Sequence, residues 1–590
     1  MNRQTACAPV EPGRRRVRLC RLKLSVQAVP VVMVLGVLLL AGCQSTPPHK
    51  KAGAPEDVTG ANGIAELKSR LAGITSSEKR VRAQAHYAAG LLHDLNNEPD
   101  QALTEYYRAG LYDSGNEELI LETTRQLLAG NQPDKALDLL LLAVDQPEAS
   151  GRIYARLGLV YLQLGRTTDA IEASRTAIRK DPLLLSGYHN LYFACLQARR
   201  PADALKALDA AAKQTKADVE FLIGVADFYG NFVLQFPSQK DAVRPRAVAV
   251  VDRALALKPG ARQLRLKLAD DYAIFGDEDK AATLYRPLAT EFDDLPAVRQ
   301  AIRAKLARIY LRADKDQDAA EQFRAIINDD PSNAEAYLYL GGMAYDQQHW
   351  ADAVGYLQKA IILAPGLEQA YYDLAASQLA LGKAEDALAT LDKARQLFPQ
   401  RFLIEYLSAL AQTRVKNYPQ ATANFTAAEV LAQAGDTNRL TPLFYFQFGA
   451  ALERKGEYGQ AEKYFLKSLK LAPDSAECLN YLGYMWAEHS TNLDQARGLI
   501  EHALKLDPKN PAYLDSMAWV LYKLGQPGPA LDYELKSVEL SEEQDETLYD
   551  HLGDIYAALK QMDKAREYWR KSLAVQPDDA VRKKLDAPGP

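Results

Sequence analysis

The chain has 590 residues, and its 71 Lys and Arg residues against 76 Asp and Glu residues leave a formal net charge of −5. A chain of this length is too long for one compact hydrophobic core, so it must form several domains or a repeat array. Its 48% hydrophobic and 25% charged residues are ordinary for a folded protein, and its acidic balance argues against nucleic-acid binding, which needs a concentrated basic surface.

The first 43 residues have the order of a secretory signal. A basic segment at 14–18 precedes an apolar run at 29–40, which is shorter than the roughly 18–20 residues that a membrane-spanning helix needs. The run then ends in Leu40-Ala41-Gly42-Cys43. These four residues resemble the lipobox of bacterial lipoproteins, which implies cleavage before Cys43 and lipid attachment to its thiol. The alternatives are an ordinary signal or a short anchor, and the route of export stays open between the general and the twin-arginine pathways.

The resemblance divides the N-terminal region into a signal peptide at 1–42 and a tether at 43–62. The tether is rich in Pro, Gly and polar residues that cannot fill a core, so we expect it to be flexible. Gln44 follows the cysteine, and the absence of Asp there resembles outer-membrane lipoproteins. The expected location is therefore the periplasmic face of the outer membrane. Cleavage would leave a net charge of −11 and three cysteines, Cys43, Cys195 and Cys478, too far apart to suggest a disulfide framework.

The rest of the chain repeats itself about every 34 residues, and a period of that size indicates a helical repeat array. An aromatic residue is followed by Leu-Gly, by two Ala or bulky residues and by Pro. Three of the clearest units are Tyr154, Leu157, Gly158, Ala170, Ala177 and Pro182; Tyr337, Leu340, Gly341, Ala353, Ala360 and Pro365; and Tyr549, Leu552, Gly553, Ala565, Trp569 and Pro577. These residues resemble the tetratricopeptide repeat (TPR), a pair of antiparallel helices, A and B.

This pattern predicts an all-α, right-handed superhelical TPR solenoid of about fourteen repeats. We expect an N-terminal helical cap at 63–82, the solenoid at 83–579 and a C-terminal tail at 580–590. Aligning the small residues places repeat starts at 83, 117, 151, 185, 219, 262, 300, 334, 368, 402, 442, 476, 511 and 546. Extra residues at 231–246, near 293–294 and at 434–441 are either tolerated loop length or local contact loops.

No sequence motif of catalysis is present, so we expect no enzyme activity, no cofactor and no metal site. The chain lacks a Gly-x-Ser-x-Gly, a His-Glu-x-x-His, a phosphate-binding loop and a Cys-x-x-Cys. His86 and His93 are spaced more loosely than a helical metal pair, and Cys195 occupies a core position. The paired carboxylates at 270–271 and 293–294 fit solvated faces or loops.

A binding surface is expected on the A helices, which line the concave face of TPR arrays. The C-terminal half places an aromatic residue at a predicted groove position in six successive repeats: Tyr345, Tyr372, Tyr406, Phe446, Tyr484, Trp519 and Tyr522. Polar residues stand among them: Asp346, Arg414, Arg454, Asn480, Glu488, Asp515 and Lys523. Aromatic anchors with a few polar groups suit protein segments. The alternative is that these aromatic residues pack adjacent helices and never meet a ligand.

The C-terminal stretches 479–484, 513–519 and 550–554 are similar to a group of Gram-negative TPR lipoproteins. The resemblance implies a non-catalytic scaffold with protein partners and no nucleic acid. Some members of that group are adaptors for a carboxyl-terminal processing protease that trims cell-wall enzymes, and others act in exopolysaccharide or pilus assembly. We expect the adaptor role, with an export-machine subunit as the alternative and an unrecognised enzyme as a distant one, because the repeat specifies fold more than partner.

Overall fold

The computed structural model describes residues 61–587. Thirty α-helices and two short 3₁₀ helices make up this part of the chain, which contains no β-strand, so the predicted all-α class is confirmed. The predicted signal peptide, the lipidation site Cys43 and nearly all of the tether lie outside the described residues.

The described chain divides into two compact units, residues 61–329 and residues 330–587. The helices of the first unit are α1 (Ala61–Ala72), α2 (Ser76–Leu95), α3 (Pro99–Tyr112), α4 (Glu117–Ala129), α5 (Pro133–Ala143), α6 (Gly151–Gln163), α7 (Thr167–Lys180), α8 (Leu185–Gln197), α9 (Pro201–Ala212), α10 (Val219–Gln235), η1 (Pro237–Gln239), α11 (Lys240–Ala256), α12 (Arg262–Phe275), α13 (Glu278–Glu291), α14 (Pro296–Arg312) and α15 (Asp316–Asp329).

The helices of the second unit are α16 (Ala334–Asp346), α17 (Trp350–Leu363), α18 (Glu368–Ala380), α19 (Ala384–Leu397), α20 (Phe402–Arg414), α21 (Tyr418–Ala434), η2 (Thr437–Arg439), α22 (Pro442–Lys455), α23 (Tyr458–Leu471), α24 (Ala476–Glu488), α25 (Leu493–Leu506), α26 (Pro511–Lys523), α27 (Pro527–Leu540), α28 (Glu546–Ala558), α29 (Met562–Val575) and α30 (Asp579–Asp586).

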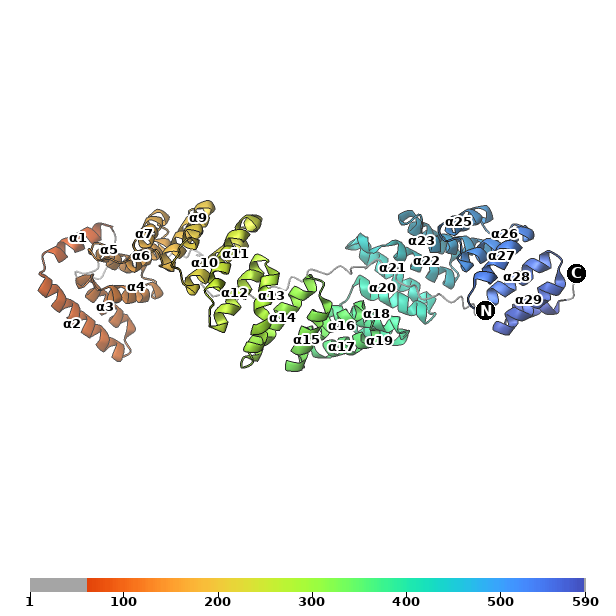
Figure 1. Cartoon of the computed structure of the whole chain (residues 1–590), viewed down its shortest axis with the longest axis horizontal. Helices are drawn as coiled ribbons and strands as arrows, with labels where there is room; N and C mark the ends of the chain where they lie inside the picture. Colours follow the sequence, from red (N-terminus) through yellow and green to blue (C-terminus); the bar gives the residue numbers. More distant parts are fainter. Residues whose placement is uncertain (1–60, 588–590) are drawn as a thin grey trace, which may run out of the picture. The chain divides into compact units, whose positions relative to one another are not determined.

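From α2 to α29 the helices pack as fourteen consecutive A–B hairpins, which Figure 1 shows as successive pairs within each unit. Helix A begins at the predicted repeat start in twelve of them. The exceptions are α2, which begins at Ser76 rather than 83, and α14, which begins at Pro296 rather than 300. Both helices extend beyond the repeat motif at their N-terminal ends, where Thr75 caps α2 and a proline opens α14.

The centre of each hairpin is a contact between the middles of its two helices. The eighth residue of helix B is buried in all fourteen: Tyr106, Leu140, Ser174, Leu208, Ala247, Tyr285, Phe323, Leu357, Leu391, Phe425, Phe465, Ile500, Glu534 and Trp569. Helix A often presents glycine there. A Cβ added to Gly341 would lie 2.5 Å from Cγ of Leu357, so glycine lets the two helices approach. This position carries a carboxylate in one hairpin alone, at Glu534.

The turn after helix A requires a left-handed residue in most hairpins. Five hairpins place glycine there, with φ between 72° and 90°. Non-glycine residues such as Gln348 and Lys416 adopt φ of 60° and 61° at the same place, at a cost of about 1 kcal/mol each. The five glycines are Gly165, Gly276, Gly382, Gly456 and Gly525, and a glycine adopts this conformation at little cost because it has no Cβ.

The extra residues lie mostly in helices. The segment 231–246 extends α10, forms η1 and begins α11, whereas 434–441 ends α21 and forms η2. None of the described helices, taken singly, has the length and apolar character to cross a bilayer. Helix α10 and residues 237–256 pass the same test only when taken together, on length and composition alone, and they are bent by 118° at the break between them. The predicted C-terminal tail begins with α30, which packs against α29 and buries Val581.

Candidate functional site

The predicted groove aromatics lie on the A helices of the second unit, but not all of them face solvent. Tyr345, Tyr406, Phe446, Tyr484 and Tyr522 are half-buried. Tyr372 and Trp519 are each only 7% exposed. Tyr372 donates a hydrogen bond to Glu368, and Trp519 is packed against the following hairpin. These two side chains therefore stabilise the stack, whereas the five half-buried ones keep accessible surface.

Several of these aromatics bridge neighbouring hairpins. The Tyr406 hydroxyl on α20 donates to Gln447 Oε1 on α22 at 2.6 Å. The Phe446 ring on α22 meets the Tyr481 ring on α24 edge-on, at 5.6 Å between centroids. Each ring is therefore held in position by the next repeat, which limits the conformational entropy that it would lose on binding a ligand.

A further set of contacts surrounds the buried Trp519 side chain. Its indole Nε1 donates a hydrogen bond to Glu488 Oε2 at 2.9 Å. Its ring stacks on the His551 ring, with 3.9 Å between the ring centroids and 13° between the ring planes. The Tyr522 ring stacks on the Trp519 ring with 5.0 Å between centroids, and the Lys523 ammonium lies 4.6 Å from the centre of the same indole. Three consecutive A helices, α24, α26 and α28, are thereby joined.

The predicted polar residues differ in their surroundings. Arg454 lies beside Glu453 and the Tyr481 hydroxyl. Although burial opposes it, the interaction with Tyr481 and Glu453 raises the pKa of Arg454, so its guanidinium stays charged beside the rings. Asp515, in contrast, is buried and does not reach the surface.

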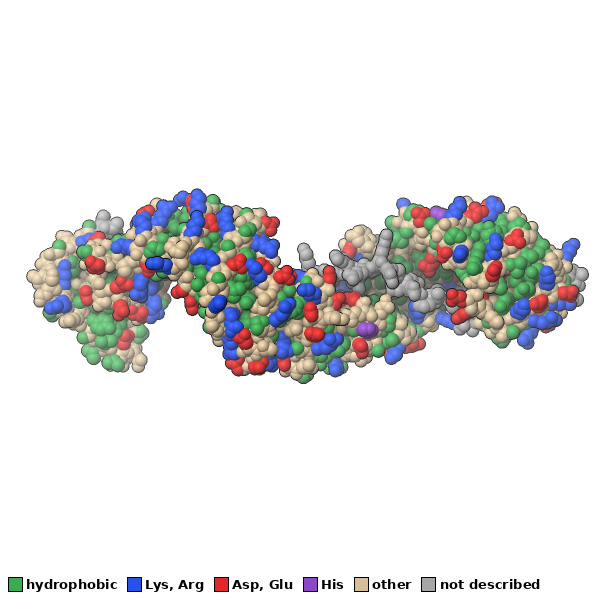
Figure 2. All heavy atoms as spheres, in the orientation of Figure 1, with side chains coloured by type: hydrophobic (Ala, Val, Ile, Leu, Met, Phe, Trp, Pro, Cys, Tyr) green, Lys and Arg blue, Asp and Glu red, His purple; other side chains and the backbone are tan. Residues whose placement is uncertain are grey.

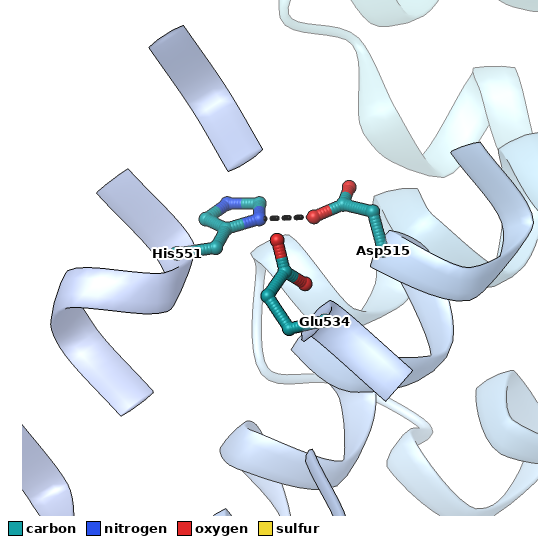
Figure 3. Close-up of side chains that lie close together, drawn as sticks. All are labelled: Asp515, Glu534 and His551. Carbon is teal, nitrogen blue, oxygen red and sulfur yellow. Dashed lines mark hydrogen bonds and ion pairs between the residues drawn. The ribbon is translucent and has the colours of Figure 1, made fainter. Parts of the chain in front are cut away.

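Asp515 belongs to a buried polar cluster with Glu534 and His551 (Figure 3). His551 Nδ1 lies 2.6 Å from Asp515 Oδ1. Burial and the neighbouring Asp515 raise the pKa of Glu534. Burial alone would lower the pKa of His551, but the Asp515 charge outweighs it and raises that pKa. The sequence analysis places Asp515 in the groove and expects no metal site. One signal in the sequence could have indicated the cluster: Glu534 is the only carboxylate at the eighth position of helix B among the fourteen described hairpins.

Other titratable groups bear on the sequence predictions. His86 and His93 each pair with a glutamate, Glu105 and Glu98, at 2.6 Å, as expected for satisfied histidines. Cys195 is a buried free thiol, as predicted. The expectation of a solvated face at 270–271 is wrong for Asp271. Its position in α12 turns it inward, where it is 1% exposed and burial raises its pKa to about 7.

The surface of the first unit has an apolar patch on α2. Figure 2 shows hydrophobic side chains gathered at the end of this helix. The exposed ones are Val81, Tyr87, Leu91, Leu92 and Leu95. Because α2 is the first helix A, no preceding hairpin in the described residues covers its outer face.

Family comparisons agree with the hairpin architecture. Three models, each described as a tetratricopeptide repeat, match residues 125–183, 304–368 and 446–511, residues 369–401, and residues 547–579. The chain is a tetratricopeptide repeat protein. TPR proteins are usually non-catalytic scaffolds for protein–protein interaction, which supports the expectation of a scaffold with protein partners.

The curated relatives match part of the chain. The TPR repeat-containing protein PA4667 of Pseudomonas aeruginosa is 31% identical over 221 residues, which is 37% of this chain and 36% of that protein. The mitochondrial import receptor subunit TOM70 of Homo sapiens is 24% identical over 245 residues, 40% of this chain and 39% of that protein. The match thus spans less than two-fifths of either relative.

Solved TPR structures share the hairpins but superpose poorly as a whole. The Cut9 and Hcn1 hetero-tetramer of APC/C is similar over 80% of this chain and 95% of that chain, with 16% identity and a TM-score of 0.35. The pilF protein of Pseudomonas aeruginosa is similar over 37% of this chain and 96% of that chain, with 20% identity and a TM-score of 0.31. Scores this low carry no information about the partner of this chain.

Proposed function

We propose that this TPR protein is a lipid-anchored scaffold that binds a protein segment along the A helices of its second unit. One observation carries the proposal: half-buried aromatic side chains recur on five of the A helices of the second unit, α16, α20, α22, α24 and α26, of which the last four are successive. The rings of Tyr406 and Phe446 are positioned by the next hairpin, and those of Tyr345 and Tyr522 by aromatic residues of their own hairpins. A line of rigid rings can anchor the apolar side chains of one bound segment at several points.

The chemistry of this surface favours a segment that carries both apolar and charged groups. Lys523 and Arg454 supply positive charge beside the rings, and Glu488 lies at the Trp519 indole. Aromatic and Arg side chains contribute most of the binding energy in many protein interfaces. Charged neighbours add orientation and partner choice more than affinity.

The specific role that we propose is that of a periplasmic adaptor for a carboxyl-terminal processing protease acting on cell-wall enzymes. Two features of the sequence support it: the lipobox at 40–43 and the resemblance of residues 479–484, 513–519 and 550–554 to TPR lipoproteins. An adaptor needs one surface for the protease and one for its substrate, and an array of fourteen hairpins offers room for both.

The adaptor role is tested by co-purification of the full-length, membrane-extracted chain with its partners, followed by mass spectrometry. We expect a processing protease together with cell-wall hydrolases. A Phe446→Ala, Tyr484→Ala double variant should lose them, and an exposed helix B variant, Leu466→Ala, should retain them. Enrichment of exopolysaccharide or pilus components in their place would overturn the adaptor role and favour an export machine.

The anchor is tested separately with Cys43→Ala. Since acyl chains attach through the lipobox thiol, the variant should lose incorporation of a palmitate analogue and should no longer fractionate with the outer membrane. Labelling that persists in Cys43→Ala would contradict lipidation at this residue. A chain that is labelled but recovered with the inner membrane would contradict the proposed location.

A further inference from the structure

The buried cluster at the last two hairpins brings three metal-ligand side chains together. Asp515 comes from α26, Glu534 from α27 and His551 from α28, and all three are buried. One ligand-type atom from each lies within 4.8 Å of the other two. In Figure 3 the Glu534 carboxylate points toward the imidazole and toward Asp515.

The surroundings of Glu534 provide a second observation, independent of the closeness of the three side chains. It is 0% exposed, and no N–H or O–H group of the described residues donates to either of its carboxylate oxygens; the neighbouring Asp515 carboxyl could bond to it only through a shared proton. The other hairpins place an apolar residue or a self-satisfied serine at this position; Ser174 donates to the Ala170 carbonyl. A buried carboxylate without a donor is costly, so an uncompensated Glu534 would destabilise the core that Leu or Phe fills elsewhere.

We propose that Asp515, Glu534 and His551 form a binding site for a divalent transition-metal ion such as Zn²⁺. One imidazole nitrogen and two carboxylate oxygens are a ligand set that Zn²⁺ accepts, whereas Mg²⁺ and Ca²⁺ prefer oxygen ligands alone. A divalent cation would also neutralise the two carboxylates, which removes the cost of burying them. The ion would coordinate both carboxylate oxygens of Glu534, or one of them, with the other accepting a hydrogen bond from a bound water.

The adjustment required of the side chains is small. Ligand atoms around a tetrahedral Zn²⁺ lie about 3.3–3.5 Å apart, given bonds of about 2.0–2.2 Å. Asp515 Oδ1 and His551 Nδ1, now 2.6 Å apart, would separate by less than about 1 Å. The most distant pair of ligand atoms, within 4.8 Å, would approach by at most about 1.5 Å, a movement that side-chain torsions of Asp515 and Glu534 would supply.

The position of the site gives the ion a structural role. Asp515 and Glu534 belong to one hairpin and His551 to the next, so the ion would fasten the last hairpin to the array. His551 also stacks on Trp519, which is bonded to Glu488. Metal binding would therefore order the C-terminal end of the aromatic surface as well.

The test uses the full chain, purified with a chelator and then dialysed, and titrated with Zn²⁺ by calorimetry and thermal melting. We expect one Zn²⁺ per chain and a rise in Tm, because a ligand that binds only the folded state stabilises it. Mg²⁺ should produce neither effect. Co²⁺ should give visible absorption bands of a site with a nitrogen ligand, and His551→Gln should remove them.

The decisive variant is Glu534→Leu, which restores the residue type found in the other hairpins and should fold. We expect it to lose the Zn²⁺-dependent rise in Tm and to bind Zn²⁺ at least tenfold more weakly. The matched control is His502→Gln, which removes an exposed histidine beside Asp474 and should leave Zn²⁺ binding unchanged. No response of the wild-type chain to Zn²⁺ would overturn the proposal, and the cluster would then hold a proton shared by Glu534 and Asp515. A response retained in Glu534→Leu would overturn it in favour of surface sites.

Discussion

Single residues define the register of the array through the contact between the middles of helices A and B. Gly341 and Gly342 are adjacent in α16, but only Gly341 faces helix B. A Cβ on Gly341 would lie 2.5 Å from Leu357 Cγ, whereas a Cβ on Gly342 would have Asp373 Oδ2 as its nearest neighbour, at 4.0 Å. The two glycines therefore form an internal control for the same substitution.

We expect Gly341→Ala to lower the free energy of unfolding by about 1–3 kcal/mol through overpacking against Leu357. Gly342→Ala should be neutral or stabilising by up to about 1 kcal/mol, since alanine is the better helix former. Thermal melting of the two variants side by side measures the difference. Equal melting temperatures would show that the close contact does not set the register in this hairpin.

Asp271 should make the stability of the first unit depend on pH. Burial raises its pKa to about 7, above the value of about 3.9 in an unfolded chain. Because the folded state holds the proton more tightly, this carboxyl favours folding below about pH 4, and the contribution is lost as the pH rises to 7. Lys267, 3.6 Å away, reduces the effect without cancelling it.

Asp271→Asn should remove this dependence. We expect its free energy of unfolding to exceed that of the wild type at pH 8 by on the order of 2–4 kcal/mol, and the gap to shrink toward pH 5. Chemical denaturation at both pH values measures the gap. Parallel profiles for the two proteins would mean that Asp271 is ionised at no cost in the folded chain.

Sequence reasoning anticipated some residues and missed others for identifiable reasons. The glycines at 158, 341, 449, 483 and 553 were predictable because steric contact between helices leaves no alternative. The burial of Trp519 and Tyr372 could not be predicted, since a side chain at an A-helix position can face a partner or the next hairpin. The neighbouring side chains decide which of the two it faces. Glu534 was concealed because a charged residue in an amphipathic helix is ordinarily exposed.

At the scale of helices, the 34-residue pattern predicted where most A helices begin, because the small residues that define the pattern are core contacts. It failed at α2 and α14, whose first turns extend past the repeat motif, and it did not separate α30 from a tail. Helix ends depend on capping and on side-chain contacts outside the repeat. Lys584 of α30 provides such contacts with Asp550 and Asp554 of α28, at 2.8 and 2.6 Å.

Removal of α30 should destabilise the last hairpin. A chain that ends at residue 578 loses the buried Val581 and leaves Asp550 and Asp554 without Lys584. We expect a loss of roughly 2 kcal/mol, from the burial of one aliphatic side chain and the loss of the ion pairs. Thermal melting compared with a chain that lacks only 588–590 measures it, and an unchanged midpoint would show that α30 does not cap the array.

At the scale of the whole molecule, each hairpin contacts mainly its neighbours within its own unit, so the fold of each unit follows from a repeated local pattern and could be predicted from it. The partner could not be predicted in this way, because the repeat specifies how helices pack and leaves the exposed side chains free to vary. The central claim is that the A helices of the second unit carry the partner.

Site-specific photo-crosslinking in living cells tests that claim most directly. A photoreactive phenylalanine would replace Tyr345 or Tyr484 on the A helices, and Leu466 or Leu535, which are exposed on the B helices, as matched controls. We predict adducts with the same protein partner at both A-helix positions and none at the controls. Adducts that form equally from Leu466 and Leu535, or from those two alone, would contradict the assignment of the binding surface.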